Sequence, residues 1–94
     1  MINIWIHSNI ARLANDKLDW QFESENGQDE LGKILEKTFA KEKNLFFGII
    51  NECGEVRKHI NIYKNGTNIK KLDGLRSIVE NGEEISIFTA VSGG

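Results

Sequence analysis

The sequence predicts an α+β domain in which a mixed sheet of about four or five strands packs on one main helix. Two patterns lead to this prediction. Apolar and polar residues alternate near both ends of the chain, as they do in strands with one buried face, and between these segments apolar residues recur at helical spacing. With 94 residues, 39% of them hydrophobic, the chain has the size and composition of one domain with an ordinary core.

The first two strands are predicted in the N-terminal quarter. Residues 2–6 carry isoleucine at every second position, and a second alternation runs over residues 18–23. The polar stretch between them, residues 8–17, holds Ile10 and Leu13 as the expected apolar anchors. Two alternating segments in succession predict a hairpin with a long loop.

One amphipathic helix is predicted over residues 28–40. Within this range, apolar residues recur at helical spacing from residue 31 to residue 39. Asp29 and Glu30 would lie near the N-terminal end, where the helix dipole favours carboxylates. The following apolar run, residues 45–50, is too short to classify by period, so a short helical turn and a core-filling loop both remain open.

A hairpin is predicted in the second half of the chain. Residues 60–63 alternate and lead into Asn65-Gly66, a dipeptide typical of two-residue hairpin turns. Residues 67–71 would return as a short edge strand. Leu72, Leu75 and Ile78 are expected to pack the connection that follows.

The last strand is predicted over residues 84–89, after a turn at Asn81-Gly82. Alternation places Ile85 and Ile87 on the inward face and Phe88 on the opposite face. Strands at both ends of the chain with one helix between them are compatible with a sheet whose first and last strands are central neighbours.

Composition excludes several functional classes. The 12 Lys and Arg residues against 14 Asp and Glu residues leave a net charge of −2, which argues against a nucleic-acid binder. No apolar run approaches the roughly 20 residues of a membrane span, and the N-terminus lacks the features of a signal peptide. The lone Cys53 excludes an internal disulfide and fits a reducing cytoplasm, and His7 and His59 show no metal-binding spacing.

The C-terminal residues Val91-Ser92-Gly93-Gly94 depart from what folding requires. Two glycines add nothing to a core and lose much conformational entropy when ordered. Without side chains, Gly93 and Gly94 would let a backbone carboxylate enter a narrow channel of a partner. We therefore expect residues 1–89 to form the domain and residues 90–94 a flexible tail; a chain end without function is the alternative for the Gly-Gly pair.

The C-terminal third resembles the MoaD/ThiS family of ubiquitin-like sulfur carriers. The resemblance rests on the strand and turn at residues 60–66, Leu-Asp-Gly-Leu at 72–75, the turn and strand at 81–88, and the tail at 90–94. This family shows a strand ending in Asn-Gly, a Leu-x-Gly-Leu element, and a glycine turn and strand that lead to Gly-Gly. The resemblance implies the β-grasp fold of ubiquitin.

The resemblance also implies a reaction at Gly94. An ATP-dependent adenylyltransferase related to ubiquitin-activating enzymes would adenylate its carboxylate, and a sulfur donor would convert it to a thiocarboxylate. A sulfur-accepting synthase, such as the large subunit of molybdopterin synthase or an analogous enzyme of thiamine or cysteine biosynthesis, would receive the sulfur. Gly93 would let the tail thread. The chain would be a carrier and not an enzyme, with no bound cofactor or metal, and ATP would be used by the partner.

Partner contacts are expected from Phe88, Val91 and Ser92. The resemblance places Phe88 at the position of an aromatic that, in the small subunit of molybdopterin synthase, packs against the large subunit. The alternative is that a neighbouring strand, Trp5 or Tyr63 covers Phe88. Thr89 stands where the family usually has proline, and Ser92 where alanine is frequent. The long segment over residues 43–58 resembles carriers that serve amino-acid biosynthesis.

Two other functions remain open. The chain could be a protein modifier joined to target lysines through Gly94, which conjugates on lysines would reveal. It could also be a non-covalent β-grasp adaptor whose Gly-Gly pair has no role, in which case deleting Gly93 and Gly94 would leave its function intact.

Overall fold

The computed structural model describes residues 1–90 of the chain. The strands are β1 (Ile2–Ile6), β2 (Asp19–Phe22), β3 (Gln28–Glu30), β4 (Ile60–Lys64), β5 (Thr67–Asn68), β6 (Ile78–Glu80) and β7 (Glu84–Thr89). The α-helices are α1 (Ser8–Ala11), α2 (Leu31–Thr38) and α3 (Lys43–Ile49), and the 3₁₀ helices are η1 (Arg12–Ala14), η2 (Ile69–Lys71) and η3 (Gly74–Arg76).

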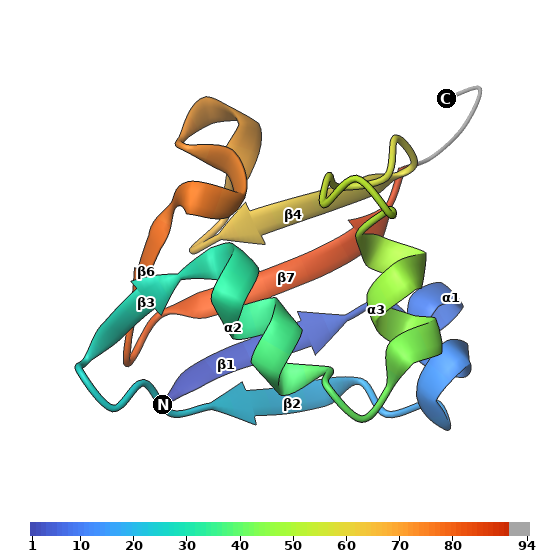
Figure 1. Ribbon diagram of the computed structural model, residues 1–94, viewed down its shortest axis with the longest axis horizontal. Coiled ribbons are helices and arrows are strands. Elements are labelled where there is room, and N and C mark those ends of the chain that lie inside the picture. Colours follow the sequence, from blue (N-terminus) through green and yellow to red (C-terminus); the bar gives the residue numbers. More distant parts are fainter. Residues whose placement is uncertain (91–94) are drawn as a thin grey trace.

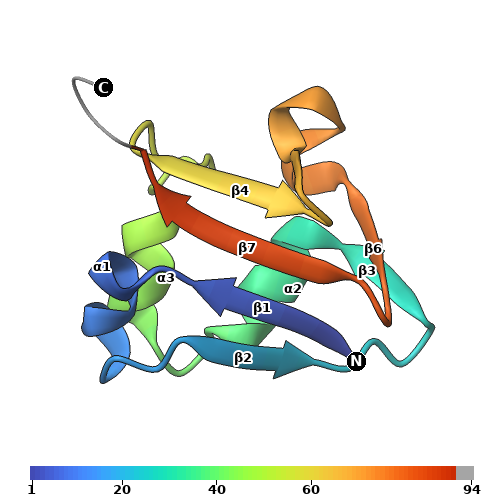
Figure 2. The same ribbon diagram turned by 180° about the vertical axis from the view of Figure 1, so that it is seen from behind.

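A mixed five-stranded sheet, ordered β2-β1-β7-β4-β5, forms one layer of the molecule. The central pair, β1 and β7, is parallel, and each of the other pairs is antiparallel. Helices α2 and α3 cover one face of this sheet, while the opposite face is bare in the reverse view (Figures 1 and 2). The predicted α+β architecture, with the first and last strands as central neighbours, is confirmed.

The prediction that a helix starts at residue 28 is wrong. Gln28–Glu30 forms strand β3, which pairs antiparallel with β6, and the helix begins at Leu31. The Ser24 hydroxyl donates to Asp29 Oδ2 at 2.8 Å. The Asn81 amide donates to the Ser24 carbonyl at 3.0 Å, and its Oδ1 accepts the Ser24 N–H at 3.1 Å. Together with the pairing to β6, these bonds hold residues 28–30 in an extended conformation. Their effect outweighs the favourable position that Asp29 and Glu30 would have at the start of a helix.

The loop between β1 and β2 contains α1 and η1, and only one of its two predicted anchors is buried. Ile10 lies in the core, but the side chain of Leu13 is 40% exposed. His7 is the N-cap of α1: its imidazole Nδ1 accepts a hydrogen bond from the Asn9 N–H. The apolar run after α2 is compatible in sequence with a helical turn or a loop. In the structure it forms helix α3, in which Leu45 and Ile49 are buried.

The second half of the chain follows the prediction with two differences. Strand β5 ends at Asn68 and gives way to η2, so the return strand is shorter than expected. Leu72 and Ile78, which were expected to pack the connection, are 43% and 42% exposed, whereas Leu75 packs against the core. The three-residue β6 pairs with β3 by its backbone and buries only Val79.

The core lies between the sheet and the helices. It consists mainly of isoleucines from β1, β4 and β7 that face leucines and isoleucines of α2 and α3. Ile85 and Ile87 are 1% and 0% exposed, so the inward face of the last strand is as predicted. Because β7 has a paired strand on each side and the core beneath it, the C-terminal end of β7 is a rigid position of the domain.

Candidate functional site

Backbone bonds on both sides hold the chain in the sheet up to Ala90, the last described residue. The N–H of His7, just after β1, donates to the Ile87 carbonyl at 2.9 Å. The N–H of Ala90 donates to the carbonyl of His59, just before β4, at 2.6 Å. Pairing therefore continues one residue beyond β7. The predicted site residues Val91, Ser92, Gly93 and Gly94 follow at once and lie outside the described residues.

An aromatic cluster of Trp5, Tyr63 and Phe88 lies on the bare face of the sheet. Trp5 and Tyr63 are both in register with Ser86, on opposite sides of β7, and Phe88 follows two residues later. The Phe88 ring centroid is 5.2 Å from that of Trp5 and 5.6 Å from that of Tyr63. All three side chains are half-buried. Phe88 is thus flanked by both rings proposed to cover it and still presents part of its surface to solvent.

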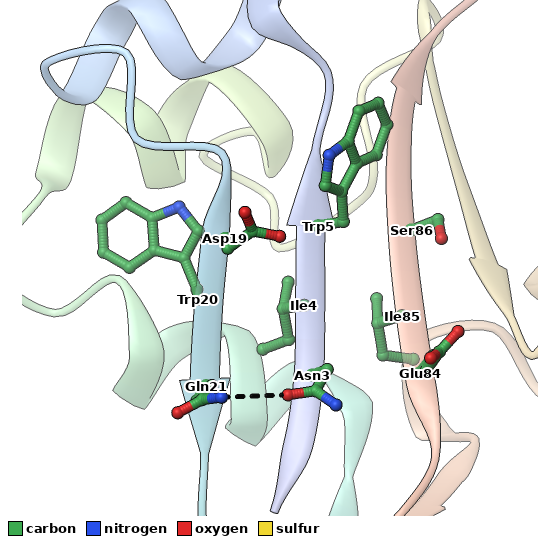
Figure 3. Close-up of a pocket in the computed structure, with 9 residues that line it drawn as sticks. All are labelled: Asn3, Ile4, Trp5, Asp19, Trp20, Gln21, Glu84, Ile85 and Ser86. Atoms are coloured by element: carbon green, nitrogen blue, oxygen red, sulfur yellow. Dashed lines mark hydrogen bonds between the residues drawn. The ribbon is translucent and has the colours of Figure 1, made fainter.

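Two shallow depressions flank the aromatic cluster. One, of about 350 Å³, lies across β2, β1 and β7 and is drawn in Figure 3. Its polar side chains include Asp19, Glu84 and Ser86, and Gln21 Nε2 donates to Asn3 Oδ1 at 3.3 Å. The other, of about 500 Å³, is lined by residues of β4 and β7 and reaches Ala90. Ser86 lines both, so polar and aromatic groups form one surface that ends where the tail begins.

Trp5 and Tyr63 belong to this surface although sequence reasoning treated them only as covers for Phe88. A signal for them exists in the alternation. Trp5 lies between inward-facing Ile4 and Ile6, and Tyr63 follows inward-facing Ile62, so both rings belong to the outward face of their strands. Aromatic residues at outward positions of three neighbouring strands indicate a binding face more strongly than Phe88 alone.

The other candidate residues do not converge. Cys53 is exposed in a turn where Asn51 Oδ1 accepts the N–H groups of Cys53 and Glu55. Within residues 1–90, no three His, Cys, Asp or Glu side chains are grouped so that they could hold a metal ion. No helix in the same range is both long and apolar enough to cross a membrane.

Comparisons with known proteins agree with this geometry. The model of the ThiS family matches residues 12–94, a range that includes the tail. Small archaeal modifier protein 3 of Haloferax volcanii is 36% identical over 64 residues, which are 68% of this chain and 68% of that protein. A putative sulfur carrier protein of Archaeoglobus fulgidus is 39% identical over 63 residues, 67% of this chain and 59% of that protein.

Among solved structures, CysO of Amycolatopsis orientalis, crystallised as a BexX/CysO complex, superposes with a TM-score of 0.84 over 100% of both chains at 17% identity. This likeness confirms the predicted β-grasp, ubiquitin-like fold. The family match spans most of the chain and reaches its Gly-Gly pair. The chain therefore belongs to the ThiS family of ubiquitin-like carrier and modifier proteins.

Proposed function

We propose that this chain is a sulfur carrier whose reacting group is the carboxylate of Gly94. The observation that carries the proposal is the bond from Ala90 to His59, which holds the exit of the chain at the end of the central strand. A tail that starts from a rigid point, beside a half-buried aromatic cluster, can be presented to an enzyme in one orientation. The sulfur-carrier name of one relative supports the same function.

The proposed reaction has two steps, the first at a carboxylate oxygen of Gly94 and the second at its carbonyl carbon. A Gly94 carboxylate oxygen attacks the α-phosphorus of ATP on a partner adenylyltransferase, and pyrophosphate leaves. Hydrosulfide from a sulfur donor then attacks the acyl-adenylate, AMP leaves with the shared oxygen, and one proton is released. The product is a thiocarboxylate. The role of the carrier is to position the carboxylate, and Gly93 allows close approach because it has no Cβ.

Docking is assigned to the aromatic cluster together with Val91 and Ser92. Aromatic side chains dominate the binding energy of protein interfaces because they bury large areas with little loss of rotamer freedom. Phe88 is two residues from Ala90, so a partner seated on it would receive the tail directly. The partners would be the adenylyltransferase and a sulfur-accepting synthase, either the molybdopterin synthase large subunit or an analogous cytoplasmic enzyme.

Intact-protein mass spectrometry tests this function. The chain is incubated with its cognate adenylyltransferase, MgATP and sodium sulfide. We expect a mass gain equal to the exchange of one oxygen for one sulfur. Deletion of Gly94 should abolish the gain, and Ser92→Ala, a small-for-small change in the tail, should retain it. An unchanged mass with an adenylyltransferase shown to be active on another carrier would refute the proposal.

A protein-modifier role is the second candidate, since one relative is named as a modifier protein. The acyl group of the same adenylate would then pass to an enzyme thiol as AMP leaves, and finally to a lysine amine of a target as the thiol leaves. No Lys or Arg follows Arg76, so trypsin would leave residues 77–94 attached to the modified lysine. Detection of such branched peptides in cells that express the chain, but not in cells with the Gly94 deletion, would establish this role.

A further inference from the structure

A second surface, which we name the α1–α3 groove, adjoins the base of the tail. It has a volume of about 710 Å³ and runs between the α1–η1 segment, α3 and the end of β7. Both views place α1 and α3 at the end of the sheet where β7 terminates (Figures 1 and 2). Thr89 lines the groove and directly precedes Ala90, so a protein that receives the tail lies next to this groove.

The apolar part of the groove consists of two exposed side chains. Leu13 is 40% exposed and Phe47 is 44% exposed, and they come from two different elements, η1 and α3. Gly48 also lines the groove, and its missing side chain leaves room for Leu13 against α3. Two large, exposed apolar groups that line one groove offer a place for one apolar side chain of a ligand.

The polar part of the groove is basic, although the chain as a whole carries a net charge of −2. Arg12, Arg57 and His59 line it, and none of its lining residues is a carboxylate. Arg12 Nε donates to the Asn9 carbonyl, and Arg57 Nε donates to the Phe47 carbonyl. These bonds orient both guanidinium groups.

Neither arginine of the groove is neutralised within the domain. The ion pairs formed among residues 1–90 are those of the N-terminus with Glu23 and of Lys64 with Glu83. The terminal nitrogens of Arg12 and Arg57 therefore have no carboxylate partner in that range. An oriented guanidinium group without a carboxylate partner is suited to form an ion pair with one carboxylate of a ligand, and the groove offers two such groups.

We propose that the α1–α3 groove binds an acidic segment, with one apolar side chain, of the protein partner that takes the C-terminal tail. Two carboxylates of the segment pair with Arg12 and Arg57, and its apolar side chain packs between Leu13 and Phe47. The identity of the partner rests on the proposed function, whereas the chemistry of the segment rests on the groove alone. The partner thus contacts the carrier on two sides of the tail, at the aromatic cluster and at this groove.

The first experiment does not require a functional tail. The ¹⁵N-labelled chain is titrated with the acetylated peptide Asp-Asp-Phe-Glu-Leu, and with Lys-Lys-Phe-Lys-Leu as the control peptide. We expect the acidic peptide alone to shift the amide resonances of Gly48, Arg57 and Thr89. Paired Arg12→Glu and Arg57→Glu substitutions should weaken binding at least about tenfold, because like charges replace opposite ones.

Matched variants separate this charge effect from a loss of folding. Lys33→Glu with Lys37→Glu makes the same change in net charge on exposed positions of α2 and should leave binding unchanged. Arg12→Gln with Arg57→Gln keeps side-chain N–H donors near the two backbone carbonyls and should also lose the peptide. Amide spectra without peptide would verify that each variant is folded.

Three results would overturn the proposal. The first is that the acidic peptide shifts no amide resonance, and the second is that the arginine variants bind it as well as the α2 control does. The third is that the shifted amide resonances are centred on Ser86 and Phe88, outside the groove. A chain truncated after Ala90 adds a fourth test. If only the truncated chain binds the peptide, and truncation itself shifts Gly48, the groove holds the chain's own tail and not a partner.

A second experiment links the groove to the tail reaction. With the cognate adenylyltransferase, the paired arginine-to-glutamate substitutions should raise the KM for the carrier about tenfold and leave kcat within about twofold, because binding and not chemistry is affected. If no thiocarboxylate forms with any variant, the proposed function fails while the peptide titration still decides the groove. If the peptide binds but the KM is unchanged, the groove serves no role in docking this partner.

Discussion

Leu13 Cδ1 lies 2.7 Å from the position that a Cβ at Gly48 would take. Leu13, in the loop after β1, thus packs closely over Gly48 near the end of helix α3. Any residue larger than glycine at this position would have to displace Leu13. Alanine favours a helix over glycine by about 1 kcal/mol, but here the new methyl group would displace Leu13.

The two effects should be separable in a double-mutant cycle. We expect Gly48→Ala alone to change the free energy of unfolding by less than about 0.5 kcal/mol, because propensity and displacement oppose each other. In a Leu13→Ala background the same substitution should stabilise the protein by roughly 0.5–1 kcal/mol. Urea denaturation provides the measurement. Equal effects in both backgrounds would mean that the contact has no energetic consequence.

Truncating a buried side chain of the central strand β7 should be far more costly than truncating an exposed side chain of β6. Ile87 is 0% exposed and Ile78 is 42% exposed. Ile87→Ala should lower the free energy of unfolding by about 2–5 kcal/mol through lost burial and a cavity. Ile78→Ala should stay within about 0.5 kcal/mol. Similar values for the two variants in denaturant titrations would contradict the assignment of β7 to the core.

The turn between β4 and β5 should depend on its glycine. Gly66 has a φ of +86° and Asn65 a φ of +48°, as a two-residue hairpin turn requires. Gly66→Ala should destabilise by roughly 1–2 kcal/mol, because an L-residue is strained in this region. Gly32, in α2, is a control whose added Cβ would stand 3.4 Å from the Leu75 carbonyl oxygen, an ordinary contact. Thermal unfolding should show a lowered Tm for Gly66→Ala only.

The aromatic cluster should contribute more to partner binding than to stability. We expect Phe88→Ala to weaken binding to the cognate adenylyltransferase by at least about tenfold, or roughly 1.4 kcal/mol, since interface aromatics are frequent hot spots. Leu72→Ala removes an exposed apolar group outside the cluster and should have no effect. Isothermal titration calorimetry would measure both. Equal affinities would assign the Phe88 ring to packing with Trp5 and Tyr63 alone.

Periodicity in the sequence was sufficient for the strands at the two ends of the domain. The isoleucines of β1 and β7 alternate strictly, so their inward faces follow from the sequence, whereas the pairing that sets Ile4 beside Ile85 was expected from the family resemblance. The Asn65-Gly66 turn was equally clear, because both of its central residues have a positive φ, which Asn and Gly adopt most readily. These elements determine the fold and the position at which the tail leaves it.

Segments whose structure depends on distant residues could not be predicted. Gln28–Glu30 has no alternation, and its extended form depends on pairing with β6 and on the bonds between Ser24 and Asn81. Leu13 has the hydrophobicity of a core residue, yet the short turns of α1 and η1 direct it to the groove. The α1–α3 groove brings together Arg12, Phe47 and Thr89, which no local motif connects.

The bond between Ala90 and His59 has a geometric consequence for the proposed reaction at Gly94. Ala90 is the last residue that the structure describes, and four residues follow it in the sequence. A fully extended chain advances at most about 3.3–3.6 Å per residue, so the Gly94 carboxylate would lie no further than roughly 14 Å from Ala90. Under the proposed function, the activating and the sulfur-accepting enzymes, however different their chemistry, would therefore both have to place their reacting atoms within this short reach of the surface on which the domain docks.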